Sequence, residues 1–114
     1  MSRDRPNVLA MLDAIAKIAE YTGPIADAGA FHLNGQVFDA TLMNFVVIGE
    51  MVDRLSEELK DRYADADWQE IKGFRNIVAH DYLGVDADEV WQIVKTHLPV
   101  LRDHLLAILK ELPD

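Results

Sequence analysis

Apolar residues at helical spacing run through most of this sequence, and they constrain its fold more than any other feature. Near the start they recur in steps of three and four residues, at Val8, Met11, Leu12, Ile15, Ile18 and Ala19. Residues at this spacing share one side of an α-helix, so the segment predicts an amphipathic helix. Asp4 is placed to cap it, Arg5-Pro6 to enter its first turn, and Gly23-Pro24 to end it.

The next long segment is expected to form the central helix. After a short helical turn and loop, in which Phe31 and Leu33 are expected to dock, Asn34 caps a helix of about residues 36–63. Apolar residues cover more than one side of this helix, which indicates burial on two sides. Gly49 costs the helix roughly 1 kcal/mol relative to alanine. It therefore indicates close approach by another helix, and a second copy of the chain is one candidate.

Two further helices are expected, each with an acidic start. Asp67 and Glu70 have the spacing of a capping box, and the helix they begin has an apolar face of Trp68, Ile71, Phe74, Ile77 and Val78. Asp86-Ala87-Asp88-Glu89 begins the last helix, which Pro99 should kink or divide near Thr96 because proline lacks an N–H. The whole pattern predicts one all-α domain over residues 1–114, an up-and-down four-helix bundle with a kinked or split last helix.

Composition narrows the compartment and the partners. The 114 residues include no cysteine, which fits a reducing cytoplasm. Neither a secretory signal nor a run of ~20 apolar residues is present, so we expect a cytoplasmic protein without a membrane partner. A formal charge of −9 disfavours tight, non-specific nucleic-acid binding. Half of the residues are hydrophobic, more than one small core needs, and this surplus predicts a homodimer.

A cluster of chemically active side chains lies at the end of the third predicted helix. Arg75, Asn76, His80 and Tyr82 fall within eight positions. Asn76 and His80 share a helix face, whereas Arg75 and His80 lie roughly 140° apart around the axis. Either the long guanidinium curls round to the imidazole, or a second copy supplies half of the site. Such a set suits attack on a phosphodiester, because histidine can move protons near neutral pH and arginine can hold extra negative charge.

The same residues also have structural interpretations. His80 is favoured near a helix C-terminus by the macrodipole, Arg75 would pair with Glu70 or Asp81, and Tyr82 would cover the helix end. Glu50 belongs either to a solvated helix face or to the site, where it would orient Arg75 or His80. We interpret three other histidines as surface or packing residues, because their spacing suggests no metal site: His32, His97 and His104. No metal or cofactor is expected.

The order and spacing of several segments resemble the HepT-like branch of the HEPN superfamily, which comprises small all-helical toxins partnered with a minimal nucleotidyltransferase. The segments that carry the resemblance are residues 44–50, 68–76, 79–82, 84–86, 90–94 and 98–101. The resemblance extends from Pro6 to Leu109, nearly the whole chain. Arg75 and His80 match the family's R-x4-H ribonuclease motif, and Tyr82 matches the tyrosine of its extended R-x4-H-x-Y form.

The resemblance implies a metal-independent endoribonuclease toxin. His80 would be the general base on the ribose 2′-hydroxyl, Arg75 would stabilise the phosphorane, and Asn76 would hold a phosphate oxygen or fix the imidazole tautomer. A cognate, MntA-like nucleotidyltransferase antitoxin would neutralise the toxin by adenylylating Tyr82. The alternative is a non-catalytic subunit of a nucleotidyltransferase that is modified or presents substrate, and a third reading is a helical dimer with a structural role. The RNA, whether transfer RNA or message, is left open.

Overall fold

The computed structural model describes residues 3–80 and 84–113, without the side chains of residues 77–80, and confirms the predicted all-α class. Every regular element within the described residues is helical. The elements are α1 (Asp4–Thr22), α2 (Ala28–Leu33), α3 (Gly35–Arg54), α4 (Glu57–Arg62), α5 (Trp68–His80), α6 (Ala87–Gln92), the π-helical η2 (Ile93–His97) and α7 (Leu98–Glu111). No helix in this described part of the chain is both long enough and apolar enough to cross a membrane.

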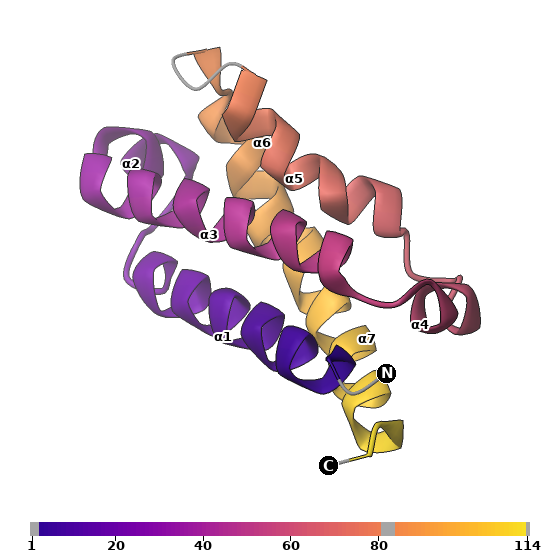
Figure 1. The fold of residues 1–114 in the computed structure, drawn as a ribbon. Helices are drawn as coiled ribbons and strands as arrows, with labels where there is room; N and C mark the ends of the chain where they lie inside the picture. The colour runs from indigo at the N-terminus through magenta and orange to yellow at the C-terminus, as the bar shows by residue number, and fades with distance from the viewer. Residues whose placement is uncertain (1–2, 81–83, 114) are drawn as a thin grey trace.

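The principal helices form an up-and-down bundle. The helix α3 packs against both α1 and α5, as its two-sided apolar pattern predicts. Figure 1 shows α6, η2 and α7 joined into one long run that crosses behind α3. Successive principal helices run in opposite directions. The first and last turns lie close together, because the Arg5 Nη1 donates to the carbonyl of Leu112 at 3.5 Å.

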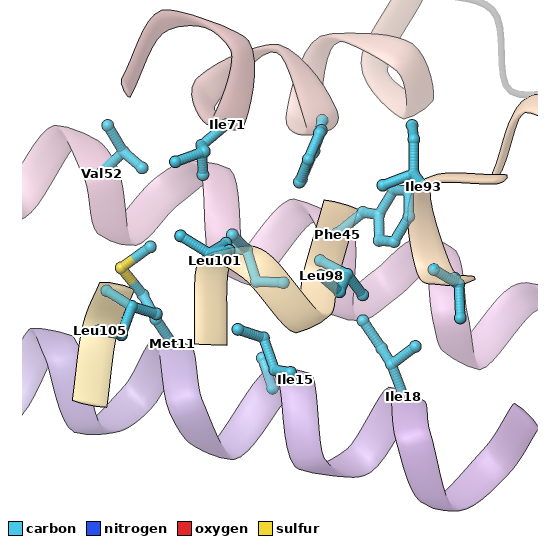
Figure 2. Packing of buried hydrophobic residues seen from close by; sticks show 14 of the residues in the cluster. Met11, Ile15, Ile18, Phe45, Val52, Ile71, Ile93, Leu98, Leu101 and Leu105 are labelled. Atoms are coloured by element: carbon cyan, nitrogen blue, oxygen red, sulfur yellow. The ribbon is translucent and has the colours of Figure 1, made fainter. Parts of the chain in front are cut away.

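One hydrophobic cluster joins the principal helices. Figure 2 shows its side chains converging from α1, α3, α5 and the C-terminal run. The largest fully buried members include Met11 and Ile18 from α1, Phe45 from α3 and Leu105 from α7. Phe45 stacks on Phe74 of α5, with ring centroids 5.2 Å apart. Residues at helical spacing in the sequence therefore do meet in one core, and burying them is the main contribution to folding.

The expected cap of α1 is wrong. Arg3 occupies the N-cap position, and Asp4 lies in the first turn with 1% of its surface exposed. Its carboxylate instead accepts hydrogen bonds from the Ser56 backbone N–H at 2.8 Å and from the Ser56 hydroxyl at 2.6 Å. The Ser56 hydroxyl in turn accepts from the Leu59 N–H and caps α4. Asp4 therefore fixes the junction between α3 and α4 against the start of the chain.

The expected helix of residues 36–63 is divided. Asn34 does cap α3, accepting from the Val37 N–H at 3.1 Å, but the backbone becomes extended at Leu55 and Ser56 before α4 begins. The burial of Leu55, which is 3% exposed, favours this break. In the preceding segment Phe31 is buried, as predicted, whereas Leu33 is 85% exposed and is not docked as predicted.

The later caps and the irregular last helix were predicted correctly. Asp67 accepts from the Glu70 N–H at 3.0 Å to start α5, and Asp86 caps α6. Pro99 falls in the first turn of α7, directly after η2. Pro99 has no N–H to donate to the carbonyl four residues back. Just before it, the Leu98 N–H donates to the Ile93 carbonyl five residues back, which is the spacing of a π-helix. The helix is thus divided at the place that Pro99 indicates.

Candidate active site

The candidate site is built where α3 and α5 touch. A Cβ added to Gly49 of α3 would come within 2.5 Å of the Arg75 Cβ and 3.1 Å of the Arg75 backbone nitrogen. Only glycine leaves room for this approach, so the predicted close helix contact at Gly49 is confirmed. Its neighbour is α5 of the same chain, which means that a second copy is not needed to explain the glycine.

Arg75 is held by two carboxylates of α3. Its Nη1 donates to the Glu50 Oε1 at 2.9 Å and to the Asp53 Oδ2 at 2.7 Å. The side chain of Arg75 is 24% exposed, and that of Glu50 is 44% exposed. Glu50 therefore contacts Arg75, as one of the two interpretations of this residue requires. Its effect on Arg75 during a reaction stays a prediction.

The ion pairs suggested for Arg75 by the sequence differ from the observed ones. Glu70 lies 3.8 Å from the His97 Nε2, on the side of α5 that faces the C-terminal run. Asp81, the other suggested partner, lies outside the described residues. The observed partner Glu50 comes from a helix that precedes Arg75 by more than twenty residues, and such a pairing depends on how α3 and α5 pack.

Asp53 is a member of the cluster that the sequence did not single out for this site. The Lys72 Nζ lies 3.1 Å from the Asp53 Oδ1, so Asp53 contacts both Lys72 and Arg75. Hydrogen bonding to Arg75, followed by the contact with Lys72, lowers the pKa of Asp53, and the same bond raises the pKa of Arg75. The sequence did contain a signal for Asp53, because this residue lies three positions after Glu50 and shares its helix face.

The remaining predicted site residues are Asn76, His80 and Tyr82. Asn76 follows Arg75 and is exposed. His80 is the last residue of α5, but its side chain lies outside the described residues, as does all of Tyr82. The structure therefore brings together Arg75, Glu50, Asp53 and Lys72. The meeting of the Arg75 guanidinium with the His80 imidazole, within one chain or between two copies, remains a prediction.

A separate pocket lies between α5 and α7. It has a volume of about 220 Å³, and its lining includes Glu70, Phe74, His97 and His104 but not Arg75. His97 is exposed, with its Nδ1 3.0 Å from the Thr96 Oγ1, and His104 is half-buried. Over the described residues, no three histidine or carboxylate side chains gather as metal ligands would. These positions agree with the interpretation of both histidines as surface or packing residues.

Comparison with known proteins identifies relatives along most of the chain. A Methanocaldococcus jannaschii protein named "Gamma-glutamylcyclotransferase and putative RNase" is 31% identical over 102 residues, which are 90% of this chain and 46% of that protein. A second protein of that organism, named "Putative RNase", is 28% identical over 81% of this chain and 84% of its own length. The "Probable ribonuclease HepT" of Thermococcus cleftensis is 28% identical, with coverages of 79% and 81%.

The chain spans less than half of the first of these relatives and about four fifths of the other two. No solved structure matches the chain at a significant level. A family model described as "Ribonuclease HepT-like" matches residues 11–108, a range that includes the helices α3 and α5 and both motif residues Arg75 and His80. On this match the chain belongs to the HepT-like ribonuclease family.

Proposed function

We propose that this chain is a metal-independent endoribonuclease and acts as the toxin of a toxin–antitoxin pair. The observation that carries the proposal is the family match over residues 11–108, which includes Arg75 and His80 at the motif spacing. The ribonuclease names of the relatives support the same activity. The close packing of Arg75 on Gly49 and its bonds to α3 support a role that needs a fixed guanidinium.

The proposed reaction is an internal attack by the RNA on its own backbone. His80 takes the proton of a ribose 2′-hydroxyl, and the resulting oxygen forms a bond to the adjacent phosphorus. The bond from phosphorus to the 5′ oxygen then breaks, and that oxygen leaves as a hydroxyl with the proton that His80 returns. Arg75 stabilises the extra negative charge of the phosphorane, and Asn76 holds a phosphate oxygen or the imidazole tautomer. The products are a 2′,3′-cyclic phosphate and a 5′-hydroxyl, and the 2′-hydroxyl removes the need for a metal-activated water.

The proposal includes a homodimer. Met43 on α3 is 63% exposed, and it shares a face of that helix with the half-buried Val46 and with Glu50. A second copy covering this face would bury Met43 and place two copies of Arg75 in one cleft. Two such cations would offset part of the repulsion between RNA and a chain with a formal charge of −9.

The proposal also includes control by a nucleotidyltransferase that adenylylates Tyr82. An adenylate on this residue would place a bulky, negatively charged group two positions from His80. That group would fill the site and repel RNA phosphate. Modification would therefore stop cleavage without unfolding the protein.

A second candidate function is that of a non-catalytic subunit, which the nucleotidyltransferase modifies or uses to present substrate. One observation favours it: the formal charge of −9 opposes the binding of RNA. If the chain only binds, the His80→Ala protein should still form the complex with the nucleotidyltransferase. Neither the parent nor this variant should then cleave RNA.

The experiment that separates the two functions uses protein produced without a nucleotidyltransferase, so that Tyr82 stays unmodified. The protein is incubated with an RNA oligonucleotide, the same sequence as DNA, and an RNA in which the 2′-hydroxyl at the cut site is replaced by hydrogen, all in excess chelator. The ribonuclease proposal predicts cleavage of the first substrate alone, with cyclic phosphate ends detected by mass spectrometry. Cleavage of DNA, or RNA cleavage that occurs only when the chelator is left out, would overturn it.

A further inference from the structure

Asp53 joins two cations of α5 through its two oxygens. Its Oδ1 lies 3.1 Å from the Lys72 Nζ, and its Oδ2 accepts from the Arg75 Nη1 at 2.7 Å. Lys72 and Arg75 are three residues apart on one helix, where like charges repel. A carboxylate between them offsets that repulsion and keeps the ammonium and the guanidinium on the same side of α5.

The two ion pairs of Arg75 occupy only one of its three nitrogens. Both contacts that Arg75 makes within the described residues run through Nη1. A guanidinium has five N–H donors, and the edge formed by Nε and Nη2 can bind phosphate with two parallel hydrogen bonds. Lys72 likewise has three donors, of which Asp53 needs one. The carboxylates therefore orient the cations without using the donors that a phosphate requires.

We propose that Lys72 and Arg75 together bind an RNA phosphate, and that Asp53 is the positioning residue that holds these two cations side by side. The proposal rests on the ribonuclease function proposed above and adds a binding residue to it. The side chains are accessible, with 36% of Lys72 and 24% of Arg75 exposed. Salt bridges at such exposure are weak, so they let the side chains turn their remaining donors toward a phosphate.

If the four charged side chains have only a structural role, Asp53 should have the opposite effect on RNA binding. Glu50 and Asp53 together cancel the charges of Lys72 and Arg75, so the four side chains could form a surface network that is neutral overall. In that case Asp53 would only repel RNA, and removing its charge would tighten binding. If Asp53 positions the cations, the same change weakens binding, although it makes the protein less acidic. The sign of the effect therefore distinguishes the two explanations.

The test measures binding by fluorescence anisotropy to an RNA oligonucleotide that is 2′-O-methylated throughout and cannot be cut by 2′-hydroxyl attack. The variants are Lys72→Ala, Lys72→Arg, Arg75→Ala and Asp53→Asn. Two matched controls lie elsewhere on the surface. Lys17→Ala removes a cation that is also paired with a carboxylate, 3.2 Å from Asp13, and Asp61→Asn removes an exposed carboxylate of α4.

We expect Lys72→Ala to raise the Kd on the order of threefold to tenfold. The slope of log Kd against log salt concentration should fall by about 0.7, as expected for one lost phosphate contact on a single strand. Lys72→Arg should restore most of the affinity. Asp53→Asn should raise the Kd, whereas Asp61→Asn should leave it unchanged or lower it. The proposal is overturned if Lys72→Ala behaves like Lys17→Ala, if Asp53→Asn tightens binding, or if the unaltered protein does not bind the RNA.

Cleavage of an unmodified RNA by the same variants separates this proposal from the proposed function. With Asp53→Asn we expect kcat to fall, because the guanidinium is less well placed, and Lys72→Ala should act mainly on KM. If the parent protein binds as described but does not cut RNA, the ribonuclease function fails and the paired cations stand. If the parent cuts RNA and both variants match their controls, the paired cations fail and the ribonuclease function stands.

Discussion

Gly49 lies directly against Arg75, so closely that a Cβ on residue 49 would be 2.5 Å from the Arg75 Cβ. This contact sets the distance between α3 and α5 at the level of the site. It also brings Glu50 and Asp53, which follow Gly49 in α3, within hydrogen-bonding distance of the guanidinium. One missing side chain on α3 therefore determines where a charged side chain of α5 can go.

Replacing Gly49 with alanine should destabilise the protein. The added methyl group must displace α5, since the atoms it meets are the Cβ and backbone of Arg75 and the backbone of Lys72. Overpacking of this kind costs about 1–3 kcal/mol, which exceeds the ~1 kcal/mol that alanine gains over glycine in a helix. Urea denaturation should show a lower free energy of unfolding for Gly49→Ala.

Gly73 provides the matched control for this change. It lies within α5, and a Cβ there would meet nothing within 4 Å. Gly73→Ala should therefore raise the free energy of unfolding by up to about 1 kcal/mol, through helix propensity alone. If the two alanine variants were stabilised to the same extent, the close packing of α3 on α5 would be wrong.

Asp4 should be one of the most sensitive acidic residues for stability. Its buried carboxylate accepts two hydrogen bonds from Ser56, and Asp4→Ala leaves both donors without this partner. We expect a loss of about 2 kcal/mol or more in thermal or urea unfolding. The control Asp13→Ala removes an exposed carboxylate from the same helix and should change stability by less than about 0.5 kcal/mol. Equal effects of the two substitutions would contradict the buried role of Asp4.

The Asp53 carboxyl should titrate below its ordinary pKa of 3.8, because Arg75 and then Lys72 stabilise its charged form. A carboxyl with a lowered folded-state pKa contributes stability above its unfolded value, and loses it as the pH falls through the folded value. The contribution should thus be constant from neutral pH to about pH 5 and disappear in stronger acid. Carbon-detected NMR titration should show the Asp53 midpoint rising in Arg75→Ala and in Lys72→Ala. A midpoint unaffected by both substitutions would show that the ion pairs do not form in solution.

Tyr63 should resist deprotonation at alkaline pH. Its hydroxyl donates to Glu111, and this bond raises the pKa of Tyr63 above 10.0. The stability from this bond is complete below the unfolded pKa and is lost as the pH rises through the folded one. Ultraviolet titration of the parent against Tyr63→Phe isolates the residue, and Glu111→Gln should bring its midpoint down. A midpoint at or below 10 in the parent would contradict the contact between Tyr63 and Glu111 of α7.

Local patterns in the sequence predicted most of the fold. Asn34, Asp67 and Asp86 begin helices as expected, because each cap acts on backbone groups only two or three residues away. Two errors arose where packing against the rest of the chain decides the outcome. Asp4 binds Ser56 rather than its own helix, and the chain breaks at Leu55, where a buried leucine and the cap of α4 outweigh the helical pattern.

The candidate site could be predicted only in part. Arg75 and His80 stand out through their spacing in one helix, and Glu50 through its place on α3. The contacts of Asp53 with Arg75 and Lys72 depend on the crossing of α3 over α5 at Gly49, and a single sequence does not specify that geometry. Close approach at Gly49 was predicted, but its partner was not, because a glycine in a helix shows that a neighbour is near and not which one.

The roles of Arg75 and His80 in RNA cleavage are tested by incubating RNA with the unmodified protein, with Arg75→Ala and with His80→Ala, all in excess chelator. Lys17→Ala serves as the control for loss of a surface cation, and circular dichroism verifies that each variant is folded. We predict cleavage by the parent and by Lys17→Ala, and a loss of at least about a hundredfold in kcat for each site variant. If the folded parent leaves RNA intact, or if both site variants cut as fast as the parent, the assignment of this site to RNA cleavage is contradicted.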